Sequence, residues 1–207
     1  MFRNIKIKKH NLNKGFTLVE LLVTIVIFVI ITGVVLINSN KFDNTILLDN
    51  LGYDVALTIK LAQSYGVNVR ESSSATFNSA YGVYFNTDAS SGGSNTNFVL
   101  FNDTNSDKIY NGDIKSCPTD SLECIQKYSM QKGTHIKSLC ISSNTGILDC
   151  SVTELSILFQ RPRLEALIYA DRQSDLKPSA EIILSSAEGA ISTVVVTSAG
   201  EIYVKKQ

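Results

Sequence analysis

The longest apolar run of the chain lies close to the N-terminus and covers residues 16–37. It is built from Leu, Val, Ile, Phe, Thr and one Gly, with Glu20 as its single ionisable residue. A helix of this length extends about 33 Å at 1.5 Å per residue, enough to cross a hydrocarbon core of about 30 Å. The pattern therefore predicts a membrane-spanning helix over residues 16–37.

A second helical pattern follows over residues 38–72, after a polar stretch at 38–44 that is either a turn of helix or a short break. Its apolar residues recur at intervals of three and four, which is the spacing of one face of an α-helix. These residues are Leu47, Leu48, Leu51, Val55, Ile59, Ala62 and Val69. We expect this amphipathic continuation to pack on a sheet and to end near Tyr65-Gly66 and the serines at 72–74.

From residue 73 onward the chain reads as short strands separated by Gly, Asn and Ser clusters. Apolar and polar positions alternate at 98–100 and 164–168, so we expect sheets with one face on the core and one in water. The expected strands cover residues 81–86, 97–102, 124–130, 135–141, 154–160, 164–170, 180–186, 192–198 and 201–205. The last three should form a meander. The predicted fold class is α+β: a long N-terminal helix packed against antiparallel sheets, with a β-rich head at 73–207.

Charge sets the expected orientation of the spanning helix. Five of the nineteen Lys and Arg residues precede Gly15, which leaves fourteen basic against nineteen acidic residues in the rest of the chain. Basic residues mark the cytoplasmic side of a span, so we expect a single-pass inner-membrane protein with residues 1–15 in the cytoplasm and the head outside it. A cleaved secretion signal is the alternative, but the run is long for one and no small-x-small cleavage site closes it.

Four cysteines lie in the exported part, at Cys117, Cys124, Cys140 and Cys150. An even number in an oxidising compartment favours two disulfides, for which three arrangements are possible. We favour Cys117–Cys124, which closes a short loop, and Cys140–Cys150, which flanks a turn at 144–146. A zinc site is the alternative, but gaps of six and nine residues are not ligand spacings.

A candidate calcium loop occupies residues 103–113. Its five candidate ligands are Asp103, Asn105, Asp107, the carbonyl of Ile109, and Asp113. The alternate spacing of the first three matches the start of a calcium loop, but Lys108 stands where such a loop has glycine and Ile114 where it has a bidentate Glu. An ordinary Asx-rich turn is the alternative, and we expect no required cofactor.

Other chemistry expected of the head is limited. Arg161, Arg163, Arg172 and Lys177 are candidates for a DNA-binding patch, since phosphate binding needs converging cations. Acidic residues are interleaved with them, which favours a mixed solvated surface over nucleic-acid binding. His135 is the only histidine after Gly15, and no catalytic motif of hydrolases, phosphate-binding enzymes or metalloproteases is present, so we expect no enzyme activity.

The stretch Lys14-Gly15-Phe16-Thr17-Leu18-Val19-Glu20 stands between a basic leader and the apolar run. It resembles the prepilin-type cleavage and methylation signal of type IV pilins and type II secretion pseudopilins. The resemblance implies cleavage between Gly15 and Phe16 by a membrane prepilin peptidase, which also methylates the new amino group of Phe16. It further implies a structural subunit that an assembly platform lifts from the membrane into a filament, where its N-terminal helix contacts other pilins.

The resemblance also gives Glu20 a role in assembly. Cleavage leaves a positive amino group on Phe16 at a helix N-terminus, where the macrodipole already favours a negative Glu20 one turn away. In a filament, the carboxylate neutralises the amine of a neighbouring subunit inside an apolar bundle, where an unpaired charge is costly. The alternative is an ordinary signal-anchor helix whose Glu reaches the membrane interface.

Two features bear on the subfamily. Many major pilins have a helix-bending proline where this chain has Ile37, and Gly33 is the only helix breaker nearby. The C-terminal meander is similar to the end of H-type minor pseudopilins and related minor pilins. We therefore expect a minor pilin or pseudopilin at the start or tip of a filament; the alternative is a DNA-binding or adhesive minor pilin whose head has its own ligand.

Overall fold

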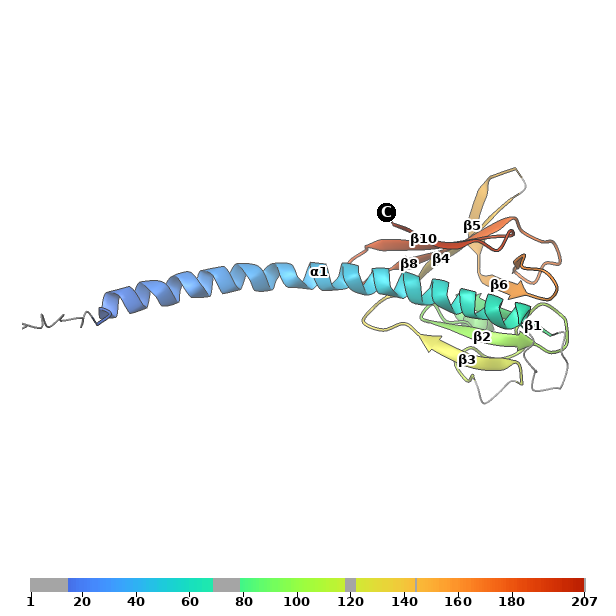
Figure 1. Ribbon diagram of the computed structural model, residues 1–207, viewed down its shortest axis with the longest axis horizontal. Helices are drawn as coiled ribbons and strands as arrows, with labels where there is room; N and C mark the ends of the chain where they lie inside the picture. Colours follow the sequence, from blue (N-terminus) through green and yellow to red (C-terminus); the bar gives the residue numbers. More distant parts are fainter. Residues whose placement is uncertain (1–14, 69–78, 118–121, 144, 207) are drawn as a thin grey trace, which may run out of the picture. The chain divides into compact units, whose positions relative to one another are not determined.

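The computed structural model describes residues 15–68, 79–117, 122–143 and 145–206, with the side chains of 37–46 and 206 outside the description. It confirms the α+β class, with a long helix and two five-stranded antiparallel sheets (Figure 1). The chain divides into two compact units, Met1–Asn40 and Lys41–Gln207. The leader up to Lys14, together with Val69 and the serines at 72–74, lies outside the described residues.

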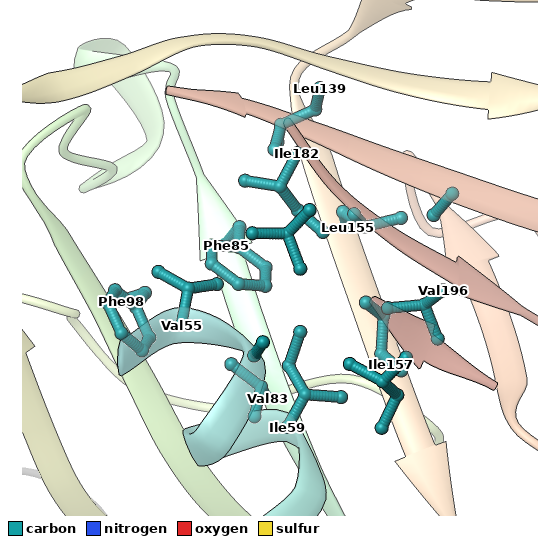
Figure 2. Packing of buried hydrophobic residues seen from close by; sticks show 14 of the residues in the cluster. Val55, Ile59, Val83, Phe85, Phe98, Leu139, Leu155, Ile157, Ile182 and Val196 are labelled. Atoms are coloured by element: carbon teal, nitrogen blue, oxygen red, sulfur yellow. The ribbon is translucent and has the colours of Figure 1, made fainter. Parts of the chain in front are cut away.

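Helix α1 runs without a break from Leu18 to Val67, so the polar stretch at 38–44 continues the helix. Within the second unit its apolar face is buried at Leu48, Val55, Ile59 and Ala62. Figure 2 shows Val55 and Ile59 pointing into the core beside strand residues. Burial of one such side chain contributes about 1.5–3 kcal/mol, so packing on the sheets stabilises this half of the helix.

The last turn of α1 lies unusually close to a strand. A Cβ atom placed on Gly66 would come within 2.3 Å of the carbonyl oxygen of Phe159. One residue earlier, the ring of Tyr65 meets the ring of Tyr81 edge to face, with centroids 5.7 Å apart. Glycine is a poor helix former, and its place here is explained by this contact with the backbone.

Ten strands and one short 3-10 helix make up the rest of the described fold. The elements are β1 Ala80–Asn86, η1 Ala89–Ser91, β2 Asn97–Asp103, β3 Cys124–Ser129, β4 His135–Ser142, β5 Leu148–Val152, β6 Glu154–Phe159, β7 Leu167–Ala170, β8 Ser179–Ser185, β9 Ile191–Thr197 and β10 Ile202–Lys206. Nine of these strands correspond to expected ones, and β5 is the addition. Leu164 was expected at the start of a strand, but it precedes β7 and is exposed.

The strands form two sheets with a simple order. The first sheet runs β3-β2-β1-β6-β7 and the second runs β10-β9-β8-β4-β5. All the pairings are antiparallel, and β8, β9 and β10 form the expected meander. Ile182 of β8 lies opposite Leu139 of β4 on one side and Val194 of β9 on the other.

The main core lies between α1 and both sheets. Figure 2 shows Phe85 of β1 and Leu155 of β6 from the first sheet close to Ile182 from the second. All three side chains are completely buried. The core therefore joins residues that are about a hundred positions apart in the sequence. The helix and both sheets all contribute side chains to it.

The first sheet has no wet face along β2, contrary to the expected alternation. Phe98 and Leu100 face the main core, but the alternate residues Val99 and Phe101 are also buried, in a second cluster. Residues 104–117, which we call the covering loop, contribute Tyr110, Ile114 and Cys117 to this second cluster. The covering loop thus buries the face of β2 that the alternation predicts to be exposed to solvent.

Candidate processing and assembly segment

Thr17 occupies the N-cap position of α1. Its side-chain oxygen accepts a hydrogen bond from the backbone N–H of Glu20 at 3.3 Å, and its carbonyl accepts one from the N–H of Leu21 at 3.2 Å. Thr-x-x-Glu at the start of a helix is the pattern of a capping box, in which the threonine satisfies a free amide of the first turn. The cap fixes the start of the helix at Leu18.

The expected cleavage site lies just before this cap. Gly15 and Phe16 are outside the helix and exposed, and the space around Gly15 is open. A peptide bond in this position can enter the active site of a peptidase without any helical hydrogen bonds being broken. Cleavage here and methylation of Phe16 stay predictions.

Glu20 lies in the first turn of α1 and is its only acidic residue there. The unpaired backbone N–H groups of that turn give the helix end a partial positive charge, which stabilises a carboxylate at this position. Removal of residues 1–15 would place the amino group of Phe16 at the same end. The pairing of Glu20 with an amine is a prediction about the assembled state.

The segment after Glu20 is long and apolar enough to cross a membrane, from Leu18 to Leu36. Its large side chains are exposed on every face of the helix. The hydroxyls of Thr24 and Thr32 donate to the carbonyls of Leu21 and Phe28, at 2.8 and 2.7 Å. The hydroxyls of both threonines are therefore hydrogen-bonded within the helix. Glu20 is the one ionisable residue of Leu18–Leu36, so its carboxylate is the group of this segment that needs a partner.

The candidate calcium residues form a network of Asx turns within the covering loop and just before it. Asp103 accepts the N–H groups of Asp107 and Lys108, and Asp107 accepts the N–H of Ile109 at 2.9 Å. Asp113 instead accepts the N–H of Lys115 at 2.8 Å, in a turn of its own. Among the described residues, no group of three or more His, Cys, Asp or Glu is arranged to hold a metal. Calcium binding stays a prediction.

The electrostatics of this network depend on burial. Desolvation raises the pKa of the buried Asp103, against hydrogen bonding and the charge of Lys108. Partial burial also acts to raise the pKa of Asp107, but hydrogen bonds from Asn111, Ile109 and Asn105 outweigh it and lower that pKa.

A buried acid that the sequence pattern did not reveal anchors the covering loop. Glu123 accepts hydrogen bonds from the N–H and hydroxyl of Thr104, both at 3.3 Å, and from the N–H of Asn111 at 2.9 Å. It therefore ties two distant points of the loop to the start of β3. No sequence motif marks Glu123, because its partners are backbone amides that only the fold brings together.

Two disulfides are present, Cys117–Cys124 and Cys140–Cys150, in the arrangement favoured from the sequence. The first joins the end of the covering loop to β3. The second joins neighbouring strands β4 and β5. Both staple peripheral segments to the sheets, a role typical of disulfides in exported domains.

Three of the four basic residues considered for DNA binding pair with acids. Arg172 donates from its Nε to Glu154 at 2.8 Å, Lys177 pairs with Asp175, and Arg163 lies 3.8 Å from Glu165. This arrangement agrees with the mixed solvated surface favoured from the sequence. Burial raises the pKa of Tyr84 to about 12, with a smaller contribution from the nearby Glu154. This phenol therefore stays neutral.

Comparison with known proteins bears on the N-terminal segment alone. Residues 10–36 match a family model described as the prokaryotic N-terminal methylation motif. No curated protein and no solved structure gives a significant match to the chain. The chain therefore carries a type IV pilin-like prepilin signal that continues into an apolar helix. This combination fits a membrane-anchored structural subunit.

Proposed function

We propose that this chain is a minor pilin or pseudopilin, processed by a prepilin peptidase and assembled through its N-terminal helix. The main support for the proposal is the order of structural features along residues 15–36. An exposed Gly15–Phe16 bond is followed at once by a capped helix, a first-turn acid and an apolar span. The methylation-motif match covers the same residues.

The proposed mechanism is transfer of the apolar helix Leu18–Leu36 from the membrane into the filament. The apolar surface of Leu18–Leu36 needs a cover on all sides, which lipid provides before assembly and neighbouring helices provide afterwards. Glu20 and the amino group of Phe16 become paired between subunits when water is excluded. Because an unpaired buried charge costs several kcal/mol, this pairing favours a register in which each acid meets an amine.

The head would be carried outside the cytoplasm as a rigid body. Its two disulfides and its own core within Lys41–Gln207 fit that role. We place the chain at the start or tip of a filament, or in a secretion piston, on the strength of Ile37 in place of a helix-bending proline and of the C-terminal meander.

The proposal is tested by co-expressing the chain with a prepilin peptidase and analysing the mature N-terminus by mass spectrometry. The expected product begins with N-methylated Phe16. Replacement of Gly15 by a bulky residue should block processing, with Gly33→Ala as the matched control, because both glycines have open space around them. Recovery of a chain that still begins at Met1 would contradict the proposal.

A further inference from the structure

The covering loop contains the one Asn-Gly pair of the chain, Asn111-Gly112. Both residues are exposed and lie outside helices and strands. Asparagine followed by glycine is the pair most prone to lose its side-chain amide in water, because glycine has no side chain to keep its backbone nitrogen away from the asparagine carbonyl carbon. The covering loop therefore presents a reactive pair of residues to solvent.

Within the described residues, the two reacting groups are held by few hydrogen bonds. No group in that part of the chain bonds to the N–H of Gly112. The side-chain amide of Asn111 is bonded through its nitrogen, which donates to Asp107 Oδ2 at 2.6 Å, while its carbonyl oxygen has no partner there. No printed contact thus stands between the Gly112 nitrogen and the carbonyl carbon of Asn111.

Asn111 is also one of the points at which the covering loop is held. Its backbone N–H donates to the buried Glu123, and its side chain donates to Asp107. On either side of it, Tyr110 and Ile114 are buried in the second cluster, 2% and 1% exposed. The reactive pair lies between these two anchors, so a change in the length of the backbone there must displace one of them.

We propose that Asn111 is a site of spontaneous deamidation that releases the covering loop from the first sheet. The backbone nitrogen of Gly112 bonds to Cγ of Asn111 and loses its proton to solvent, and the Cγ–Nδ2 bond breaks as ammonia leaves. Water then opens the resulting succinimide ring at either carbonyl, which gives aspartate or isoaspartate at position 111. The net reaction consumes water, releases ammonia and involves no oxidant or reductant.

Either product weakens the hold on the covering loop. Aspartate replaces an N–H donor by a negative oxygen opposite Asp107 Oδ2, and two carboxylates at hydrogen-bond distance repel each other. Isoaspartate carries the main chain through the former side chain, which adds one backbone carbon between Tyr110 and Ile114. Because the loop contains no helix or strand, it opens locally while the sheets stay folded.

Local opening changes the surface of the head. The face of β2 that carries Val99 and Phe101 loses the cover of the loop and becomes exposed to solvent. The head thereby gains an apolar surface that increases with the age of the molecule. This modification site is independent of the N-terminal assembly segment.

The test is to age the mature full chain in detergent micelles in mildly alkaline buffer and to map its peptides by mass spectrometry. Asn105-Ser106 in the same loop is the internal comparator, because the serine side chain hinders the attack that glycine allows. Gly112→Ala is the matched variant, since Gly112 has no positive φ and alanine fits its backbone. Hydrogen exchange of the same samples reports opening of the loop, with β9 as the reference.

We expect Asn111 to convert at least tenfold faster than Asn105, and Gly112→Ala to slow its conversion at least tenfold. In the converted molecules, the loop amides should exchange at least tenfold faster than in fresh chain, with β9 unchanged. The proposal would be overturned if Asn111 stayed intact in the folded chain while the guanidinium-unfolded chain converted. Conversion that left exchange in the loop unchanged would overturn it equally.

Both of these decisive results come from the unaltered chain, so they stand even if Gly112→Ala fails to fold in a thermal melting check. Processing and filament incorporation are measured on fresh chain. A failure of this proposal therefore leaves the assembly role intact.

Discussion

The side-chain oxygen of Thr17 accepts a hydrogen bond from the backbone N–H of Glu20 at 3.3 Å, and this contact fixes where α1 begins. Phe16 and Thr17 then stand between the expected cut and the first helical residue, Leu18. A new amino group on Phe16 would lie about one turn from the Glu20 carboxylate. One short sequence thus contains the expected cleavage site, the start of the helix and the first-turn acid.

Thr17→Val should loosen the first turn of α1. Valine has the same shape but no oxygen to accept the Glu20 amide, and loss of such a cap costs about 1 kcal/mol. Hydrogen exchange of the Glu20 amide, measured by NMR in detergent micelles, should become about fivefold faster. Thr17→Ser keeps the acceptor and should exchange at the original rate. Equal rates in the valine variant would show that Thr17 does not cap the helix.

Gly66→Ala should destabilise the head, although the same change in an open helix stabilises by about 1 kcal/mol. The added methyl would meet the Phe159 carbonyl oxygen at 2.3 Å, and backbone atoms cannot move aside as a flexible side chain can. We expect a loss of about 2 kcal/mol in the free energy of unfolding by urea. Asn50→Ala, at an exposed position of the same helix, is the control. A stabilised Gly66→Ala variant would refute this packing.

The covering loop should loosen in acid through Asp107. Hydrogen bonds lower the pKa of this carboxyl, so its stabilising contribution is present above the unfolded pKa of about 3.9 and is lost as the pH falls through the lowered value. The amide of Ile109, which donates to Asp107, should therefore report an NMR titration midpoint below the ordinary value of a free aspartate. Asp107→Asn should abolish that titration. A midpoint above the unfolded value would reverse the sign of the effect.

All four cysteines should be unreactive in the mature chain isolated from membranes. Cys117–Cys124 and Cys140–Cys150 leave no thiol for a maleimide, whereas a head kept in the cytoplasm would be reduced. Mass spectrometry should find no label before reduction and four labels after it. Labelling of the unreduced native chain would place the head in a reducing compartment.

The sequence predicted individual helices and strands well where the apolar residues follow one clear periodicity. The unbroken apolar run and the spacing of Val55, Ile59 and Ala62 led to α1, and nine strands lie where β-type runs stand between turn residues. Strand β5 was missed because its residues Leu148–Val152 are mostly exposed and carry little apolar pattern. The turn sequence at 144–146, just before this strand, was the signal that indicates a hairpin there.

Features that depend on distant contacts could not be read in the same way. Val99 and Phe101 were expected in water, since nothing in β2 indicates that Tyr110 and Ile114 cover them. Glu123 and the Glu154–Arg172 pair likewise acquire their roles from partners that the fold supplies.

Incorporation of Glu20→Gln subunits into sheared filaments is the most direct test of the assembly mechanism. The amide is the same size as the carboxylate but cannot neutralise an amine. We expect the variant to be cleaved and methylated like the original chain yet to stay in the membrane fraction, largely absent from filaments or from the tip complex. Incorporation at the original level would contradict the pairing of Glu20 with the Phe16 amine.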